Sequence, residues 1–233
     1  MEPCMPRHAA RAVPPSQDLR TARLRTPGLM LLVALCASCT PTTPIDEARA
    51  MRTGEEVTLR GYVTVPPGAF SSALGDPGFA LQDDTGGIYV KVDTKQPYDV
   101  GTRVRVTGIL DEQNRLRILK AAPADMESGG GRRVLAPRDV GTGDVDEDVE
   151  GLLIRVSGAV TRTFQDDSPY GYKLYVDDGG GEVQVFVHVS AGFERGQLEA
   201  LALGERITVV GLAAQYETTY EVAPRFPSDL TRP

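Results

Sequence analysis

Leu59-Arg-Gly-Tyr-Val-Thr64 returns later in the chain as Val156-Ser-Gly-Ala-Val-Thr161, and this repetition decides the fold. Phe79-Ala-Leu-Gln-Asp-Asp84 returns in the same way as Tyr172-Lys-Leu-Tyr-Val-Asp-Asp178, and in both places glycines and a second apolar stretch follow. The segments recur in one order with the same glycines. A period of this kind indicates a tandem duplication of a unit of about 80 residues.

Within each copy, apolar and polar residues alternate as they do in half-buried strands. Each copy predicts five short strands, with a glycine-bearing hairpin between the second and third strands and a wider gap before the fourth. This is the order of an OB-fold barrel. Gly61 and Gly158 fall inside the first strands, where a small barrel has to bend. The sequence therefore predicts an all-β chain of two tandem five-stranded OB-fold barrels; a single β-sandwich across both copies is the alternative.

The expected division of the chain follows from these repeats. Residues 45–52 have helix composition, and so do residues 193–202, between the third and fourth strands of the second copy. The glycine run 129–131 and the acidic run 144–150 indicate a linker. The predicted segments are a signal peptide at 1–38, a lipidated tether and short helix at 39–56, the first barrel at 57–120, a linker at 121–149 and the second barrel at 150–233.

Leu29-Met-Leu-Leu-Val-Ala-Leu-Cys-Ala-Ser-Cys39 follows a segment with Arg20, Arg23 and Arg25. Basic residues, a short apolar run and then small residues are the order of a secretory signal. The apolar run is shorter than the ~20 residues that cross a bilayer. Ala37-Ser38-Cys39 resembles the lipobox of bacterial lipoproteins, which implies that Cys39 is lipidated, although Cys36 stands where that pattern usually has Leu. An ordinary secretory signal that leaves a free thiol is the alternative.

Charge and cysteine content limit the function classes. Residues 1–38 carry five Arg against two acids, so with a net charge of −7 for the whole chain the remainder carries −10. This sign disfavours a nonspecific grip on DNA or anionic lipid. Cys4, Cys36 and Cys39 are the three cysteines, so a chain that begins at Cys39 has no internal disulfide and no zinc–cysteine site.

Several segments resemble the OB-fold modules of secreted bacterial nucleases and lipoproteins. In the first copy they are Gly54-x-x-Val-Thr-Leu-Arg-Gly-Tyr-Val-Thr-Val-Pro-Pro-Gly68, Gln82-Asp-Asp-Thr-Gly-Gly87 and Val104-x-Val-Thr-Gly108; in the second, Asp177-Asp-Gly179 and Tyr220-x-x-Ala-Pro-Arg225. The resemblance covers roughly residues 45–230. It implies the fold and the tandem arrangement, and it implies no activity, because family members join these modules to separate catalytic domains.

Residues for catalysis or metal binding are few. Without the signal, His188 is the only histidine, and one histidine makes neither a metal site nor a triad. The carboxylate pairs Asp83-Asp84 and Asp177-Asp178 are either calcium ligands or turn residues. The ligand ladder of a calcium loop is missing, which favours turns. No glycine-rich phosphate loop is present, so we expect no enzyme activity, no metal and no cofactor.

Binding residues are predicted from the side of each strand that faces away from the barrel interior. OB-folds bind oligonucleotides or oligosaccharides on the outer faces of strands two and three, and aromatic plus basic residues form base-stacking platforms. The null hypothesis is that these are ordinary exposed strand residues. The candidates are Arg60, Tyr62, Tyr89 and Lys91 in the first copy and Lys173, Tyr175, Phe186 and His188 in the second.

Together these features predict a non-enzymatic, lipid-anchored binding or adaptor protein of the bacterial cell envelope. Expected partners are the membrane, through the anchor, and single-stranded nucleic acid, a polysaccharide or an envelope protein. A structural envelope lipoprotein and an accessory factor of a secreted nuclease are the alternatives. Because Lys and Arg outnumber Asp and Glu only in the first copy, a nucleic-acid ligand is expected there rather than in the second copy.

Overall fold

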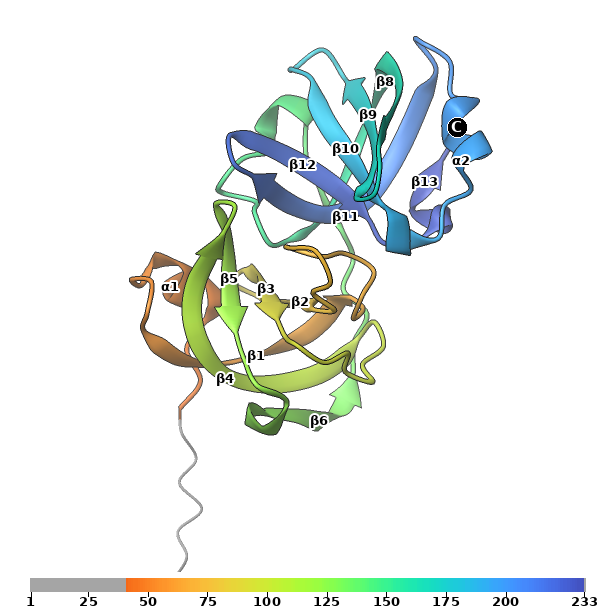
Figure 1. The fold of residues 1–233 in the computed structure, drawn as a ribbon. Coiled ribbons are helices and arrows are strands. Elements are labelled where there is room, and N and C mark those ends of the chain that lie inside the picture. Colours follow the sequence, from red (N-terminus) through yellow and green to blue (C-terminus); the bar gives the residue numbers. More distant parts are fainter. Residues whose placement is uncertain (1–40, 233) are drawn as a thin grey trace, which may run out of the picture. The chain divides into compact units, whose positions relative to one another are not determined.

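The structure is a computed structural model and describes residues 41–232, all of which belong to one compact unit. The predicted signal segment and Cys39 lie outside the described residues. The all-β class predicted from the sequence is confirmed: most elements are strands, and the helices are short (Figure 1). No helix in the described part of the chain is long and apolar enough to cross a membrane.

The first half forms a closed five-stranded barrel. Antiparallel pairing runs from β1 to β2, β2 to β3, and β5 to β4, β3 pairs with β5 in parallel, and β4 returns to β1. This closure gives each strand one inward and one outward side. The strands are β1 (Glu56–Val65), β2 (Phe79–Gln82), β3 (Gly87–Lys91), β4 (Thr102–Gln113) and β5 (Leu116–Lys120).

The second half repeats this pairing order. Its strands β8, β9, β10, β12 and β11 pair in sequence, with β10 and β12 parallel, and β11 pairs again with β8. The strands are β8 (Leu153–Asp167), β9 (Gly171–Asp177), β10 (Val183–His188), β11 (Arg206–Tyr216) and β12 (Thr219–Pro224); the short β13 (Leu230–Thr231) adds to β11, and β7 (Arg138–Asp139) to β8.

Gly61 shows why these strands need glycine. A Cβ at this position would lie 2.6 Å from the backbone oxygen of Gln82, because β1 passes very close to the neighbouring strand. A Cβ on Gly158 of the second copy would lie 2.8 Å from the backbone oxygen of Asp177. The repeated glycine thus marks the same close backbone approach in both halves.

Two helices and several single turns complete the structure. The two expected helices are present, as α1 (Ile45–Ala50) and α2 (Arg195–Glu199), both shorter than the predicted segments. The 3-10 turns are η1 (Pro123–Asp125), η2 (Thr142–Asp144), η3 (Val189–Ala191) and η4 (Pro227–Asp229). Part of the expected linker is a strand: β6 (Met126–Arg132) pairs with β4 and extends the first sheet.

Each barrel has its own apolar interior, and a third apolar cluster lies between the two barrels. We call this cluster the interbarrel core. Its members come from the end of β1, the loop before β2 and the outward sides of β2, β3 and β5, and from the outward sides of β11 and β12. They are Val65, Ala69, Phe70, Ala80, Tyr89, Leu116 and Ile118 of the first half and Leu212, Ala214 and Ala223 of the second. The barrels therefore pack through the strand faces that surround these residues, as Figure 1 also shows.

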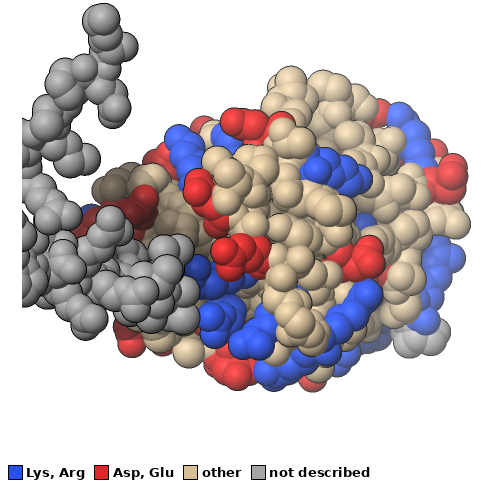
Figure 2. Space-filling view, turned by 90° about the horizontal axis from the view of Figure 1, so that it is seen from below, with Lys and Arg blue, Asp and Glu red and all other residues tan. Residues whose placement is uncertain are grey.

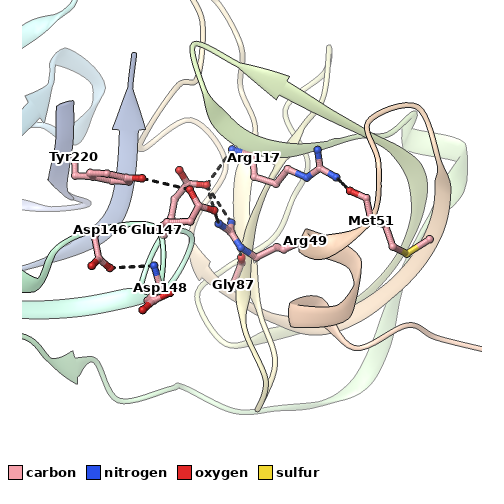
Figure 3. Close-up of polar contacts among 9 residues, drawn as sticks. Arg49, Met51, Gly87, Arg117, Asp146, Glu147, Asp148 and Tyr220 are labelled. Carbon is pink, nitrogen blue, oxygen red and sulfur yellow. Dashed lines mark hydrogen bonds and ion pairs between the residues drawn. The ribbon is translucent and has the colours of Figure 1, made fainter. Parts of the chain in front are cut away.

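Polar contacts reinforce the same interface (Figure 3). Arg49 of α1 donates to Glu150 at 3.1 Å and to Glu147 at 2.6 Å, and the backbone N–H of Arg117 on β5 donates to the same Glu150 oxygen at 3.0 Å. Burial raises the pKa of Glu150, and the Arg49 charge opposes that rise. Arg225 crosses the interface elsewhere, because its guanidinium donates to the backbone oxygen of Thr64 at 2.8 Å.

Candidate binding surface

The structure separates the two predicted binding faces. On β3, Tyr89 is fully buried in the interbarrel core, and its hydroxyl donates to the backbone oxygen of Phe70 at 3.1 Å. Tyr89 does point away from the interior of its own barrel, as predicted, but the second barrel covers it. It is therefore not accessible to a ligand in this structure. Burial raises the pKa of its phenol accordingly.

The other first-copy candidates do not gather around Tyr89. Arg60 is exposed on β1, and Tyr62 is half-buried beneath the Arg133 guanidinium, whose carbon lies 5.6 Å from the ring centroid. Lys91 is half-buried at the end of β3 and donates to Gln113 at 2.9 Å. The outer face of β2 and β3 in the first barrel is thus closed, and these residues lie around it.

The equivalent face of the second barrel carries all four of its predicted residues. Register pairs Phe186 with Lys173 and brings Tyr175 beside Gln184, so β9 and β10 present one continuous row of outward side chains. We call this row the second-barrel face; each of its members is half-buried except Gln184, which is more deeply covered. It consists of Lys173, Tyr175, Gln184, Phe186 and His188.

Both cations at this face are neutralised by carboxylates. Lys173 forms an ion pair with Asp167 at 3.0 Å. Arg162 pairs with Glu182 and lies over the ring of Tyr175, with its guanidinium carbon 4.2 Å from the centroid, which is cation–π geometry. A ligand at this face therefore meets aromatic rings and compensated charges.

Two hydrogen bonds connect Tyr175 to a buried carboxyl group. The Tyr175 hydroxyl donates to the Gln184 side-chain oxygen at 3.0 Å, and the Gln184 amide donates to Glu221 of β12 at 2.6 Å. Glu221 is only 4 % exposed. Burial raises the pKa of its carboxyl to about 7, while the Gln184 hydrogen bond and the Lys173 charge act in the opposite direction.

A hollow of about 540 Å³ opens beside Tyr175 and Gln184. It is open to solvent, and three loops border it: η2, the turn between β9 and β10, and the turn between β11 and β12. Its volume lies within the ~300–1,000 Å³ of small-ligand sites. Thr142, Thr218, Thr219 and Tyr220 are among its lining residues, and the Thr142 hydroxyl is already bonded to Asp178.

His188 closes the other end of the second-barrel face. Its ring Nδ1 lies 2.6 Å from the Ser190 hydroxyl, and its centroid lies 6.4 Å from the rings of both Phe70 and Phe186. Burial lowers its pKa. Among the described residues, no group of three or more His, Cys, Asp or Glu is placed to hold a metal ion.

The aspartate pairs act in turns. Asp83 accepts hydrogen bonds from the backbone N–H of Thr85 and Gly86 and, with its other oxygen, from that of Ile45 at the start of α1. Asp177 and Asp178 accept from the glycines of the second hairpin, and Asp178 also holds Thr142 of η2 at 2.8 Å. These contacts match the turn interpretation for Asp83, Asp177 and Asp178, whereas Asp84 forms an ion pair with Arg133 at 2.9 Å.

Sequence reasoning missed Arg162, Gln184 and Glu221. Alternation along residues 183–188 places Gln184 on the same side as Phe186, so this residue could have been found. Glu221 is outward by the same rule, but its burial depends on its neighbours. Register shifts in β8 around Arg162 break the alternation there, and no sequence signal locates its side chain.

No protein-family model and no curated protein sequence matches the chain. Among solved structures, the hypothetical protein ygiW from E. coli is similar, at 20% identity and a TM-score of 0.31, over 38% of this chain and 90% of that chain. A murine DNA binding protein bound to double-stranded DNA is similar at 11% identity and a TM-score of 0.40, over 75% and 96% of the two chains. A replication protein A heterotrimer bound to single-stranded DNA has 11% identity and a TM-score of 0.31, over 80% and 53%.

Proposed function

We propose that this chain is a non-enzymatic, lipid-anchored binding protein of the bacterial cell envelope, and that it binds a polysaccharide on the second-barrel face. One observation carries the proposal. The outer face of β2 and β3 is buried under the second barrel, whereas the matching face of β9 and β10 stays accessible beside a hollow of about 540 Å³. In OB-folds this outer face is where oligonucleotides or oligosaccharides bind.

The charges on this face favour a sugar polymer over a nucleic acid. Nucleic-acid affinity depends on Lys and Arg that replace counterions on phosphates. Here Lys173 is paired with Asp167 and Arg162 with Glu182. Aromatic rings next to hydroxyl and amide groups fit the alternating apolar and hydroxyl-bearing surfaces of sugar rings.

Titration calorimetry on residues 41–233 tests the ligand class. We expect heat of binding with an N-acetylglucosamine oligomer or an oligo-uronate, and none with oligothymidylate, even at low salt. Salt-dependent binding of oligothymidylate would reassign the face to nucleic acid. Silence with a broad glycan array would remove the polysaccharide proposal and leave the protein-partner alternative, which a pull-down from envelope extracts would test.

The anchor is tested separately in cells. Cys39→Ala removes the only sulfur available for acylation after the expected cleavage, and it should move the protein from the membrane fraction to the soluble fraction. Metabolic labelling with an alkyne fatty acid should label the unmodified chain and not the variant. If the variant stays in the membrane fraction, lipidation of Cys39 is not what holds it there.

A further inference from the structure

An arginine-bearing surface lies on the first barrel, away from the second-barrel face. Outward side chains of β1 and β4 form it: register places Arg60 opposite Arg105 and Tyr62 opposite Arg103. Like charges directly opposite each other on one sheet face destabilise it. We call this surface the arginine face, and Figure 2 views the molecule from the side of β4 and β6, where blue side chains lie among fewer red ones.

Two of these arginines lack an internal counterion. The side chains of Arg60 and Arg103 form no ion pair or hydrogen bond with any residue in the part of the chain that the structure describes. By contrast, Arg132 and Arg133, just beyond β6, pair with Asp99 at 3.6 Å and Asp84 at 2.9 Å. Glu127 of β6 lies opposite Arg105. Uncompensated positive charge therefore concentrates on Arg60 and Arg103.

The chain enters the barrel near Arg60. The backbone N–H of Thr43 donates to the backbone oxygen of Thr58 at 2.8 Å, and Thr58 stands two positions before Arg60 on the same side of β1. Four residue steps separate Thr43 from Cys39, and such a segment spans at most about 14 Å. At physiological salt, charges on the protein and on a membrane attract each other over a Debye length of about 8 Å. A tether of this length therefore keeps Arg60 close enough to a membrane for such attraction.

We propose that the arginine face rests on the anionic lipid headgroups of the leaflet that holds the anchor. The proposal builds on the lipidation of Cys39 in the proposed function. A short tether and an unpartnered basic surface next to its attachment point bring Arg60 and Arg103 to the headgroup layer. Lipid anchors commonly combine with basic surface charge in this way. The second-barrel face belongs to the other barrel, so a ligand that binds there does not compete with the membrane for the arginine face.

Arginine footprinting tests this orientation without cellular lipidation. Cys39, the only cysteine of residues 39–233, is coupled to a maleimide phospholipid in vesicles of phosphatidylcholine, with or without phosphatidylglycerol. Phenylglyoxal modification is then followed by mass spectrometry. On the phosphatidylglycerol vesicles, Arg60 and Arg103 should react about tenfold more slowly than on phosphatidylcholine alone, and high salt should remove the difference because it screens the contact.

Arg115 and Arg206 are the internal controls, since both are exposed and also have no ion pair among the described residues. Their reaction rates should be the same on both vesicles. Equal rates for Arg60 and Arg103 on the two vesicles would overturn the proposal. So would protection by added oligothymidylate with none from phosphatidylglycerol, which would assign the face to nucleic acid. Failure of the Cys39→Ala test in cells would leave the footprint unchanged, so the two failures are distinguishable.

A charge-reversal pair provides a second measurement. Arg60→Glu/Arg103→Glu and Arg115→Glu/Arg206→Glu alter net charge equally, and all four positions are outside the barrel interiors. In vesicle sedimentation of residues 41–233, the first pair should reduce binding to phosphatidylglycerol vesicles by about tenfold and the second pair should change it little. Equal losses would show a net-charge effect and contradict a specific face.

Discussion

Glu221 lies on the outward side of β12, yet it is almost entirely buried. Its charged neighbours are Lys173 and Asp167, and Gln184 donates to it at 2.6 Å. Burial dominates, and it raises the carboxyl pKa from an ordinary 4.5 to about 7. A carboxyl with this pKa is largely protonated in the folded protein at mildly acidic pH.

Glu221 should therefore make stability depend on pH. Between the unfolded pKa of 4.5 and the folded pKa of about 7 the folded chain holds the extra proton. The free energy of unfolding then falls as pH rises through this window, by up to roughly 3 kcal/mol, and is constant above it. Glu221→Gln keeps the volume and should remove this slope. Urea unfolding at about pH 5 and about pH 8 measures it.

The comparison between variant and unmodified protein isolates Glu221 from His188. The lowered pKa of His188 gives a slope of the opposite sign, with stability gained as pH rises, and this slope is present in both proteins. If Glu221→Gln leaves the pH dependence unchanged, the pKa of Glu221 is the same in the folded and unfolded protein. Burial would then not keep this carboxyl protonated.

Tyr175 lines the hollow and, through Gln184, is hydrogen-bonded to Glu221. If the second-barrel face binds polysaccharide, Tyr175→Ala should weaken glycan affinity by about fivefold, because it removes an aromatic contact worth ~1 kcal/mol. Tyr175→Phe keeps the ring and loses only the hydroxyl bond to Gln184, so its effect should be smaller. Calorimetry measures both. Tyr170→Ala, at a half-exposed tyrosine outside the hollow, is the matched control and should bind as the unmodified chain does.

At the residue scale, the sequence predicts the side of a strand but not what covers that side. Alternation correctly puts Phe186 and His188 on one outward face. The same rule puts Tyr89 outward, and it is outward from its own barrel, but the interbarrel core encloses it. Burial by a second barrel depends on the packing of distant segments, and a strand pattern contains no information about it.

At the scale of elements, β3 begins where it meets the loop before β8. A Cβ on Gly87 would lie 2.0 Å from the backbone oxygen of Gly151, and a Cβ on Gly151 would lie 2.2 Å from that of Gly87. Gln82, at the end of β2, accepts from the backbone N–H of Leu153 at 2.9 Å. The backbones at Gly87 and Gly151 are therefore in direct contact, and no side chain lies between them that could move aside.

Gly87→Ala should consequently destabilise the protein by about 2 kcal/mol, because the two loops must separate to admit a methyl group. Chemical unfolding measures the loss. Gly130→Ala is the control: its Cβ would meet nothing within 4 Å, and the residue has no positive φ. A Gly87→Ala variant as stable as Gly130→Ala would mean that the loops part at little cost.

Strand positions were predictable because alternation is strong and the glycines repeat. The extent of β4, from Thr102 to Gln113, and the existence of β6 were not. The run Gly129-Gly-Gly131 has the composition of a linker, and it becomes a strand only because β4 offers an unpaired edge to it. Edge pairing of this kind overrides local propensity.

For the whole molecule, the interbarrel core makes the two barrels depend on each other. Phe70, Tyr89 and Leu212 lose water only when both barrels are folded. The Arg49–Glu150 pair adds a polar contact across the same interface. Unfolding one barrel thus exposes apolar surface of the other.

We expect residues 41–233 to unfold in one cooperative transition. Calorimetric and van't Hoff enthalpies should then agree. Leu212→Ala, which opens the interbarrel core without touching either barrel interior, should lower the midpoint, by about 2–4 °C for each kcal/mol lost. Two separate transitions in the unmodified protein would show that the interface contributes little to stability.

At the scale of the whole molecule, the sequence predicts the duplication but not how the two barrels pack. The repeated segments indicate two copies of one unit, since similar residues recur in the same order. No pattern in either copy predicts that β2, β3 and β5 of the first barrel pack against β11 and β12 of the second. Alanines at positions 80, 214 and 223 read as unremarkable strand residues until both faces are seen together.

The first copy leaves the ribosome with the surface around Tyr89 still bare. It gains its cover only when the later half, with Leu212 and Ala223, has been synthesised and folded. Until then the early half exposes an apolar surface, which chaperones can bind and which favours self-association. A fragment that contains only the first barrel would keep this apolar surface exposed, because the second barrel is what covers it.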